Sequence, residues 1–341
     1  MKSNTGIIKI RGERHLPRRI NKLAIVASVL AFTMIIFIVL TFIQADNLMR
    51  REAEALTSFT SNIMPDYRLA SFPSLDEQTN LSGWFFPAIG TPLSTIILVH
   101  DNAGNRLQFD LDSPKLFELL VNSGYNVLAF DLRNSGKSEG SLSTYGYGEW
   151  ADVLAAIQYA RQYASTEDVI LYGFGSGVSA ALMAWQELLP SDTNQEDIPS
   201  ELKRLTYDRD YIKAVILDTP AVSPDEYISA DCRDGSLLGD YLLQHTVPYA
   251  IRLSAGHSGS ANLITIVSQM QIPVFITWSE SNNFLGTKTS NTFSNERIKL
   301  YPDLTHVYIS DAEGYLQSWF QDQEDYATEL TYFLKRYVSK S

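Results

Sequence analysis

The sequence predicts an α/β fold, with a mostly parallel sheet, helices on both faces and one N-terminal transmembrane helix before it. Three observations support this prediction. Short apolar runs of strand length alternate with segments of helical periodicity from about residue 95 onward. The run Val169 to Tyr172 breaks at Gly173 and resumes at once as a small-residue helix, which is how a parallel strand turns sharply into a helix. Near the N-terminus, Leu23 to Ile43 is an uncharged stretch of 21 residues.

The first 22 residues predict a cytoplasmic tail, because seven Lys and Arg precede Leu23 against one acid, Glu13. As a helix, residues 23–43 would span about 31 Å, enough for the hydrocarbon core of a bilayer. A signal-peptide cut after Ala45 would put bulky Ile43 where a small residue belongs, so we expect an uncleaved, single-pass anchor. The positive-inside rule then places the C-terminal domain outside the cell membrane.

The rest of the chain is strongly acidic. Of the 27 Lys and Arg and 39 Asp and Glu in the chain, 20 and 38 follow the tail, a formal charge of −18. This balance disfavours nucleic acid and anionic lipid headgroups as partners. Cys232 is the only cysteine, which excludes an intrachain disulfide and a Cys-rich metal site, and we expect neither metal nor cofactor. An extracytoplasmic domain without disulfides fits a bacterial envelope.

We divide the outer chain into a stalk, residues 44–66, and one domain, residues 67–341. Mixed charges over residues 46–66 predict that the stalk is helical. Residues 67–72 and 80–86 flank a turn-rich segment and predict a hairpin. The expected strands that follow are residues 95–99, 125–130, 169–172, 214–217, 274–278 and 298–301. The expected helices include residues 150–164 and 324–337.

A lid insertion is expected over about residues 223–262. Its apolar positions predict a face that roofs a pocket. These positions are Tyr227, Ile228, Leu237, Leu238, Tyr241, Leu242, Leu243, Val247 and Tyr249. His245 and His257 lie in the same segment without a neighbouring Cys or His, so we expect packing or surface roles for them.

Three motifs stand at the ends of the expected strands. They are Ser82-Gly-Trp in the hairpin, the loop from His100 to Asn105, and the turn from Phe130 to Gly140. Together with the sharp turn around Gly175, they resemble the α/β-hydrolase fold family, in particular its bacterial group of serine peptidases and lipase-like enzymes. The resemblance implies a nucleophile elbow at residues 173–177 and an oxyanion loop that contains His100, Asp101, Asn102 and Gly104.

The departures from the family pattern fall at the catalytic positions. The resemblance implies a nucleophile at residue 175, and glycine there has no side chain that could attack a substrate. Counting from Pro273 puts Asn282 at the position of the acid, where an amide cannot stabilise an imidazolium. His306, which follows the last expected strand, stands where the family's base does. Asp101 replaces the usual glycine of the oxyanion loop, where a carboxylate opposes a developing oxyanion.

Three residues could supply missing groups. Ser176 is a possible displaced nucleophile, although a Ser at a helix start is also what capping preferences favour. Asp218, at the end of the strand over residues 214–217, is a possible acid, although its other interpretation is a strand-end turn residue. Glu280 is a second candidate for the acid.

These patterns leave three hypotheses about function, the last of which is a structural or interaction protein in which the pocket plays no part. The first is a membrane-anchored, extracytoplasmic pseudoenzyme that binds a small molecule or an envelope protein without turnover. The alternative is an active serine hydrolase, esterase-like or peptidase-like, that uses Ser176 with His306. Under the first hypothesis we expect Gly175→Ser to return a weak nucleophile that depends on His306.

Overall fold

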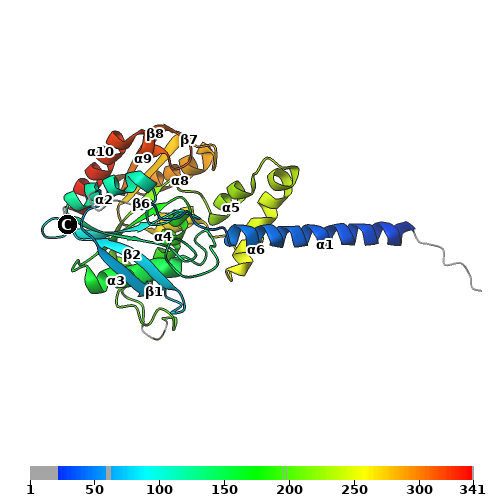
Figure 1. Cartoon of the computed structure of the whole chain (residues 1–341), viewed down its shortest axis with the longest axis horizontal. Helices are drawn as coiled ribbons and strands as arrows, with labels where there is room; N and C mark the ends of the chain where they lie inside the picture. The colour runs from blue at the N-terminus through cyan, green and yellow to red at the C-terminus, as the bar shows by residue number, and fades with distance from the viewer. Residues whose placement is uncertain (1–21, 59–62, 195, 197, 340–341) are drawn as a thin grey trace, which may run out of the picture. The chain divides into compact units, whose positions relative to one another are not determined.

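The computed structural model describes residues 22–58, 63–194, 196 and 198–339. The chain divides into one compact unit up to Leu40 and a second that contains Thr41 to Ser341. Helix α1 (Lys22–Met49) is, in the part of the chain described, the helix long and apolar enough to cross a membrane. Figure 1 shows the elements in chain order.

The second unit is built on an eight-stranded sheet in the order β1-β2-β4-β3-β5-β6-β7-β8. The pairs β1–β2 and β2–β4 are antiparallel, and the other pairs are parallel. The strands are β1 (Arg68–Pro73), β2 (Asn80–Phe86), β3 (Ser94–Val99), β4 (Tyr125–Phe130), β5 (Val169–Phe174), β6 (Ile212–Asp218), β7 (Val274–Ser281) and β8 (Thr305–Glu313). This arrangement confirms the predicted fold class and the hairpin at its start.

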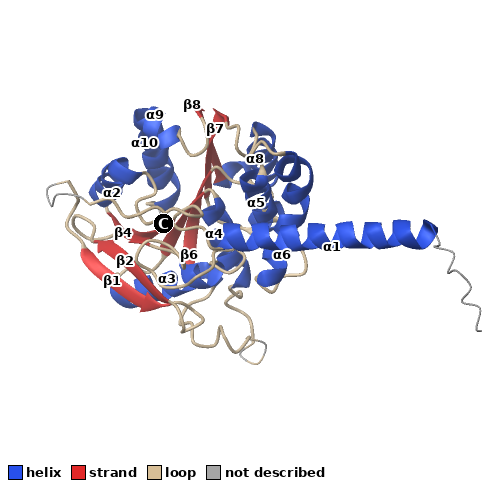
Figure 2. Cartoon of the chain, turned by 45° about the vertical axis from the view of Figure 1, so that its right-hand side comes forward, coloured by secondary structure: helices blue, strands red, loops and turns tan. Residues whose placement is uncertain are grey.

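Helices cover both faces of the sheet (Figure 2). Alternate residues of a strand point to opposite faces, so Ile97 and Val99 pack in one core while Ile96 and Leu98 pack in the other. The first core contains α3 (Trp150–Tyr163), α4 (Ser176–Glu187) and α7 (Leu263–Gln269), and the second contains α2 (Ser113–Asn122), α9 (Ser318–Gln321) and α10 (Gln323–Phe333). α8 (Thr287–Leu300) contributes Phe293 to the first core.

The lid consists of α5 (Pro224–Cys232), the π-helical turn η3 (Gly239–Leu243) and α6 (Gln244–Ser254). Tyr227, Ile228 and Val247 are buried, as a roof over a pocket requires. Of the other six predicted roof residues, Leu243 is half-buried and five are exposed, so these five do not cover a pocket. They are Leu237, Leu238, Tyr241, Leu242 and Tyr249.

Two local predictions are wrong. Residues 298–301 do not form a strand, because α8 continues to Leu300 and the last strand is β8. The buried Arg297 fixes this end of α8 by donating to the carbonyls of Val267, Met270 and Ile272. A short apolar run has no periodicity by which a strand could be distinguished from the end of such a helix.

The predicted helical stalk is also wrong beyond Met49. α1 ends at Met49, and residues 51–58 contain neither helix nor strand. Instead, Arg51 pairs with Asp231 of the lid, and the Glu54 N–H donates to the Ala103 carbonyl at 2.8 Å. Residues 59–62 of the expected stalk lie outside the described residues.

Candidate functional site

The turn between β5 and α4 has the backbone of a nucleophile elbow. Gly175 stands alone between the strand and the helix with φ +51° and ψ −123°, a conformation that favours glycine. On either side, a Cβ on Gly173 would lie 2.8 Å from the nitrogen of Val178, and one on Gly177 would overlap the carbonyls of Val99 and His100. The small residues predicted at the elbow are therefore required by close backbone packing.

No room exists at Gly175 for a catalytic side chain. A Cβ built there would overlap the hydroxyl of Tyr315 and lie 2.5 Å from Oδ1 of Asp101. Two side chains from other elements thus fill the space that a nucleophile would need. Gly175→Ser would therefore require the Tyr315 hydroxyl and the Asp101 carboxylate to move before a serine there could act as a nucleophile.

Asp101 closes the N-terminus of α4. Its Oδ1 accepts hydrogen bonds from the Ser176 N–H at 2.7 Å and from the Ser176 hydroxyl at 2.8 Å. A carboxylate is favoured at this position because the first turn of a helix has free N–H donors and a positive dipole end. In a working elbow the same N–H donates to the oxyanion of the reaction. The Asp101 carboxylate therefore occupies the place of an oxyanion.

The backbone donors of the oxyanion loop have partners as well. The Asp101 N–H donates to Oε1 of Gln108 at 2.8 Å, and the Asn102 N–H donates to Oγ of Ser176 at 2.8 Å. The Gly104 N–H closes the loop on the Asp101 carbonyl at 3.1 Å. The predicted loop is thus assembled next to the elbow, but each of these donors binds an acceptor of the protein itself.

Burial controls the protonation of the two titratable groups in this loop. Burial raises the pKa of Asp101 to about 6, against the opposing effect of its hydrogen bonds from Ser176. Burial lowers the pKa of His100, which accepts the Leu132 N–H at Nε2 (2.9 Å). Because Nε2 accepts, the proton of the neutral ring is on Nδ1, which donates to the Asp101 carbonyl at 2.7 Å. His100 is consequently a structural residue of the loop.

The structure places His306 away from this site, and the prediction that it occupies the base position is wrong. His306 is the second residue of β8 and pairs in register with Phe275 near the start of β7, whereas Gly175 follows the end of β5. Through β7 and β6, His306 is level with Tyr172 in the middle of β5, three residues before Gly175, and it lies three strands away from β5. Nε2 of His306 contacts Oε2 of Glu329 at 2.7 Å.

Tyr315 occupies the place at the correct edge. It follows β8 after Gly314, and its hydroxyl reaches the space above Gly175. Burial and the nearby Asp101 carboxylate raise the pKa of Tyr315 well above its usual value, so the phenol stays neutral. The sequence pattern did not reveal this residue, because the last strand was expected at residues 298–301, which belong to the end of α8 and the turn after it. The run from Val307 to Ile309, rich in β-forming residues and followed by Gly314, was the signal that could have located it.

The predicted acid positions are engaged in local contacts. Asn282 follows β7 directly, is buried, and its Oδ1 accepts the backbone N–H groups of Phe284 and Leu285. Asp218 ends β6, but its carboxylate accepts the hydroxyls of Tyr326 and Thr219, each at 2.8 Å. Burial raises the pKa of Asp218 to about 7. Glu280 is exposed.

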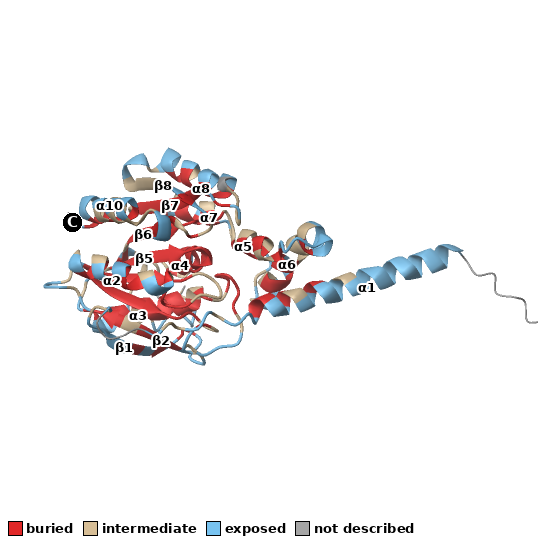
Figure 3. Cartoon of the chain, turned by 45° about the horizontal axis from the view of Figure 1, so that its top comes forward, coloured by how far each residue is buried: buried red, intermediate tan, exposed pale blue. Residues whose placement is uncertain are grey.

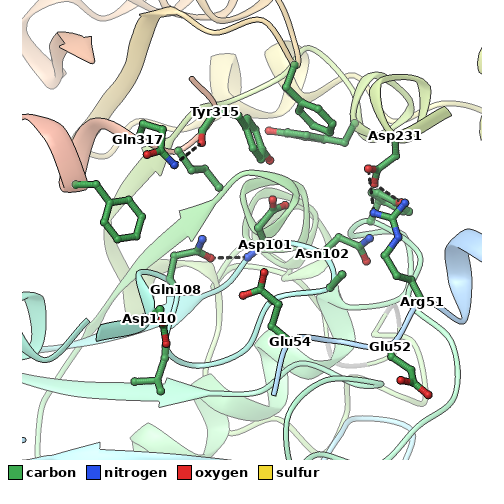
Figure 4. Close-up of a pocket in the computed structure, with 18 residues that line it drawn as sticks. Arg51, Glu52, Glu54, Asp101, Asn102, Gln108, Asp110, Asp231, Tyr315 and Gln317 are labelled. Carbon is green, nitrogen blue, oxygen red and sulfur yellow. Dashed lines mark hydrogen bonds and ion pairs between the residues drawn. The ribbon is translucent and has the colours of Figure 1, made fainter. Parts of the chain in front are cut away.

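A cavity of about 530 Å³ opens over Asp101 (Figure 4). Carboxylates and aromatic rings dominate its lining, and Arg51 is its one basic residue. The acidic residues are Glu52, Glu54, Asp101, Asp110 and Asp231, and the aromatic ones are Tyr145, Tyr227, Phe284, Tyr315 and Phe320. Arg51 is neutralised by Asp231 at 3.0 Å, and Asp231 also accepts the hydroxyl of Tyr145 at 2.6 Å. Among the described residues, no group of acids, His and Cys is arranged to hold a metal ion.

The chain matches the alpha/beta hydrolase family over residues 96–330. Among curated proteins, it is 32% identical over 149 residues to the uncharacterized protein YfhR of Escherichia coli (strain K12), which covers 42% of this chain and 44% of YfhR. It is 29% identical over 113 residues to the lysophosphatidylserine lipase ABHD12 of Gallus gallus, covering 33% of this chain and 29% of that protein. The chain thus spans less than half the length of these curated relatives.

Solved structures share the fold over a much larger part of the chain. The esterase Pf2001 of Pyrococcus furiosus aligns with a TM-score of 0.64 at 19% identity, covering 85% of this chain and 98% of the esterase. The acylaminoacyl peptidase of Pyrococcus horikoshii aligns with a TM-score of 0.56 at 15% identity, covering 81% of this chain and 42% of the peptidase. At these identities the likeness concerns the fold alone.

Proposed function

Because the chain belongs to the alpha/beta hydrolase family while its elbow holds a glycine, we propose that it is a non-hydrolytic member that binds a ligand in the cavity over Asp101. One observation carries the proposal. The Asp101 carboxylate accepts the Ser176 N–H and fills the space over Gly175, so the same group blocks both nucleophile and oxyanion. Acyl transfer needs both of these places to be open to the substrate.

Rate arithmetic supports this interpretation. Loss of the nucleophile alone costs around 10⁶ in turnover in a comparable triad, and the residual rate of about 10³ over water comes largely from the oxyanion hole. Here the base position holds Tyr315, the acid position Asn282, and the hole an internal carboxylate. The oxyanion hole, from which residual activity usually comes, is therefore also occupied by a group of the protein.

The alternative hydrolase would need a base beside Ser176. His306 lies three strands away from β5 and contacts Glu329, and both ring nitrogens of His100 are engaged with the backbone. Asp101 does contact the Ser176 hydroxyl, but the same oxygen atom also binds the N–H that would have to stabilise the oxyanion. A Ser176 hydrolase is therefore the weaker candidate.

The lining of the cavity favours a neutral or cationic ligand. Its carboxylates outnumber its one basic group, which is already paired with Asp231. Aromatic rings next to carboxylates suit an organic cation, through ring faces and charge together. An envelope protein that presents a basic or aromatic side chain to the cavity satisfies the same chemistry.

The N-terminal helix fits a retained anchor better than a cleaved signal. Ala45, Leu48 and Met49, at the end of α1, are buried in the first core, and the Met49 carbonyl accepts the Ser143 N–H at 2.8 Å. A cut after Ala45 would remove part of this packing. With the basic tail in the cytoplasm, the domain lies outside a bacterial cell membrane.

The deciding experiment treats the full-length protein, in detergent or nanodiscs, with a fluorophosphonate probe and assays short acyl esters. We expect no labelling and no ester turnover above a boiled sample. Ser176→Ala is the matched control. Labelling of the parent chain that Ser176→Ala removes would support the alternative hydrolase and overturn the proposal.

A further inference from the structure

The lid has an exposed apolar surface that faces away from the cavity. Leu237 is 80% exposed and Tyr241 70% exposed, which is unusual for large apolar side chains on a helix. Leu238, Leu242, Tyr249 and Leu253 are exposed as well. We call these six residues the lid surface. Figure 3 shows the outer part of the lid as exposed, while buried residues of α5 and α6 face the domain.

The lid surface lies next to the part of α1 where its apolar stretch ends. Residues 246, 249 and 253 recur at intervals of three or four, so they share one face of α6, and Leu242 lies in the π-helical turn just before it. Thr246, at the start of this row, contacts Oγ1 of the buried Thr41 at 3.0 Å. Thr41 lies two residues before Ile43, the end of the apolar stretch of α1. A helix rises about 1.5 Å per residue, so Thr246 lies within a few ångströms of that end.

We infer that the lid surface rests on the outer leaflet of the membrane that holds α1, a conclusion that depends on the retained anchor proposed above. The contact between Thr41 and Thr246 fixes α6 at the depth where the apolar stretch ends, whatever direction the span before Thr41 takes. Tyrosines among leucines suit this depth, because one end of the ring is apolar and the other remains hydrated. The occupant is the apolar boundary of the bilayer, since the acidic domain disfavours anionic headgroups.

If the lid surface touches the membrane, the lid is in contact with both the bilayer and the cavity. The lid supplies Tyr227 and Asp231, both from α5, to the cavity lining, and α5 packs against α6 through the buried side chains Ile228 and Val247. Among the described residues that line the cavity, none belongs to the lid surface. A ligand carried in the outer leaflet would therefore meet the lid before it reaches Asp101.

The test places an environment-sensitive NBD fluorophore on Leu237→Cys in the full-length protein in nanodiscs that contain headgroup-proximal doxyl lipids. The native Cys232 is buried and burial raises the pKa of its thiol to about 12, so it does not compete for the label. Ile89→Cys is the matched control, because Ile89 is 70% exposed in the loop after β2. Tyr249→Cys gives a second position on the lid surface.

We expect quenching at residues 237 and 249 that exceeds quenching at residue 89 by about twofold or more, since interfacial apolar faces insert about 5–10 Å into the headgroup boundary. A blue-shifted but unquenched label would mean that another protein chain covers the surface, and equal quenching at all three positions would mean that nothing does. Either result overturns the inference. Carbonate extraction separates the two proposals, because a chain retained in the membrane pellet with an unquenched lid sinks the lid inference alone. Release of the chain would sink the anchor.

Discussion

Two sets of residues at the elbow are restricted in different ways: Gly173 and Gly177 on one hand, and Gly175, Tyr315 and Asn282 on the other. Gly173 and Gly177 face backbone atoms, and any side chain there would meet β3 or α4. Gly175, Tyr315 and Asn282, at the places of nucleophile, base and acid, carry none of the groups that acyl transfer requires. The geometry of the turn is thus needed for folding, whereas the chemistry around it is not. A family match depends on the geometry of the turn and does not show whether the catalytic groups are present.

Breaking the scaffold should produce the largest effect. Gly177→Ala places a Cβ against the carbonyls of Val99 and His100, and backbone in the middle of a sheet cannot yield as a side chain can. We expect a loss of more than about 3 kcal/mol in the free energy of unfolding, or no folded protein. Gly259→Ala is the control, because nothing lies within 4 Å of a Cβ there. Denaturant unfolding of the two variants measures the difference, and equal stability would mean that the elbow is less tightly packed than described.

The second prediction concerns the carboxylate that fills the site. The folded-state pKa of Asp101 is about 6, above its ordinary value of 3.8, so the folded state holds a proton that the unfolded state has already lost. Stability therefore falls as the pH rises from about 4 to 6, and the cost is fully present above that range. Asp101→Asn keeps an acceptor for Ser176 and removes the charge, so it should stabilise the protein at pH 8 by up to about 3 kcal/mol.

Urea unfolding of the parent chain and Asp101→Asn at pH 8 and pH 4 tests this sign. The advantage of the variant should be largely lost at the lower pH, because Asp101 stays protonated in the folded state there and is about half protonated in the unfolded state. A variant less stable than the parent at pH 8 would show that attraction between the carboxylate and the N-terminus of α4 outweighs the desolvation of the charge.

The third prediction rebuilds the chemistry on the intact scaffold. Gly175→Ser, Asp101→Gly and Tyr315→His together remove both groups that crowd the elbow and add a hydroxyl and an imidazole at the same edge of the sheet. We expect weak fluorophosphonate labelling at position 175, with turnover on the order of 10⁴ below a complete triad, because Asn282 leaves the imidazole without an acid. Gly175→Ser alone should not be labelled. Labelling of that single variant would contradict the packing around Gly175.

Strand periodicity and the small residues around Gly175 were sufficient to predict the sheet and the sharp turn from strand to helix, because these signals are local, whereas the oxyanion loop was expected from the family resemblance. The sequence could not place the base position, because that required the end of β8, and the short run before it resembled a strand. It also could not show that Asp101 folds back onto Ser176, a contact between residues 75 positions apart. The lid illustrates the same limit, since an apolar pattern does not reveal whether its face meets a cavity or the outside.

The smallest effect is expected at His306, on the outermost strand β8. The His306 ring stacks on Phe275 with centroids 5.4 Å apart and contacts the partly exposed Glu329, so His306→Ala should cost about 1 kcal/mol of stability or less. Its influence on the chemistry should be nil, because its side chain contacts Phe275 and Glu329 on strands and helices away from β5, whereas Tyr315 reaches the space above Gly175. The sharpest measurement adds His306→Ala to the rebuilt triple variant and compares the rate of probe labelling. An unchanged rate assigns the base to position 315, whereas abolished labelling in a folded protein would return that role to His306 and require a different course for β8.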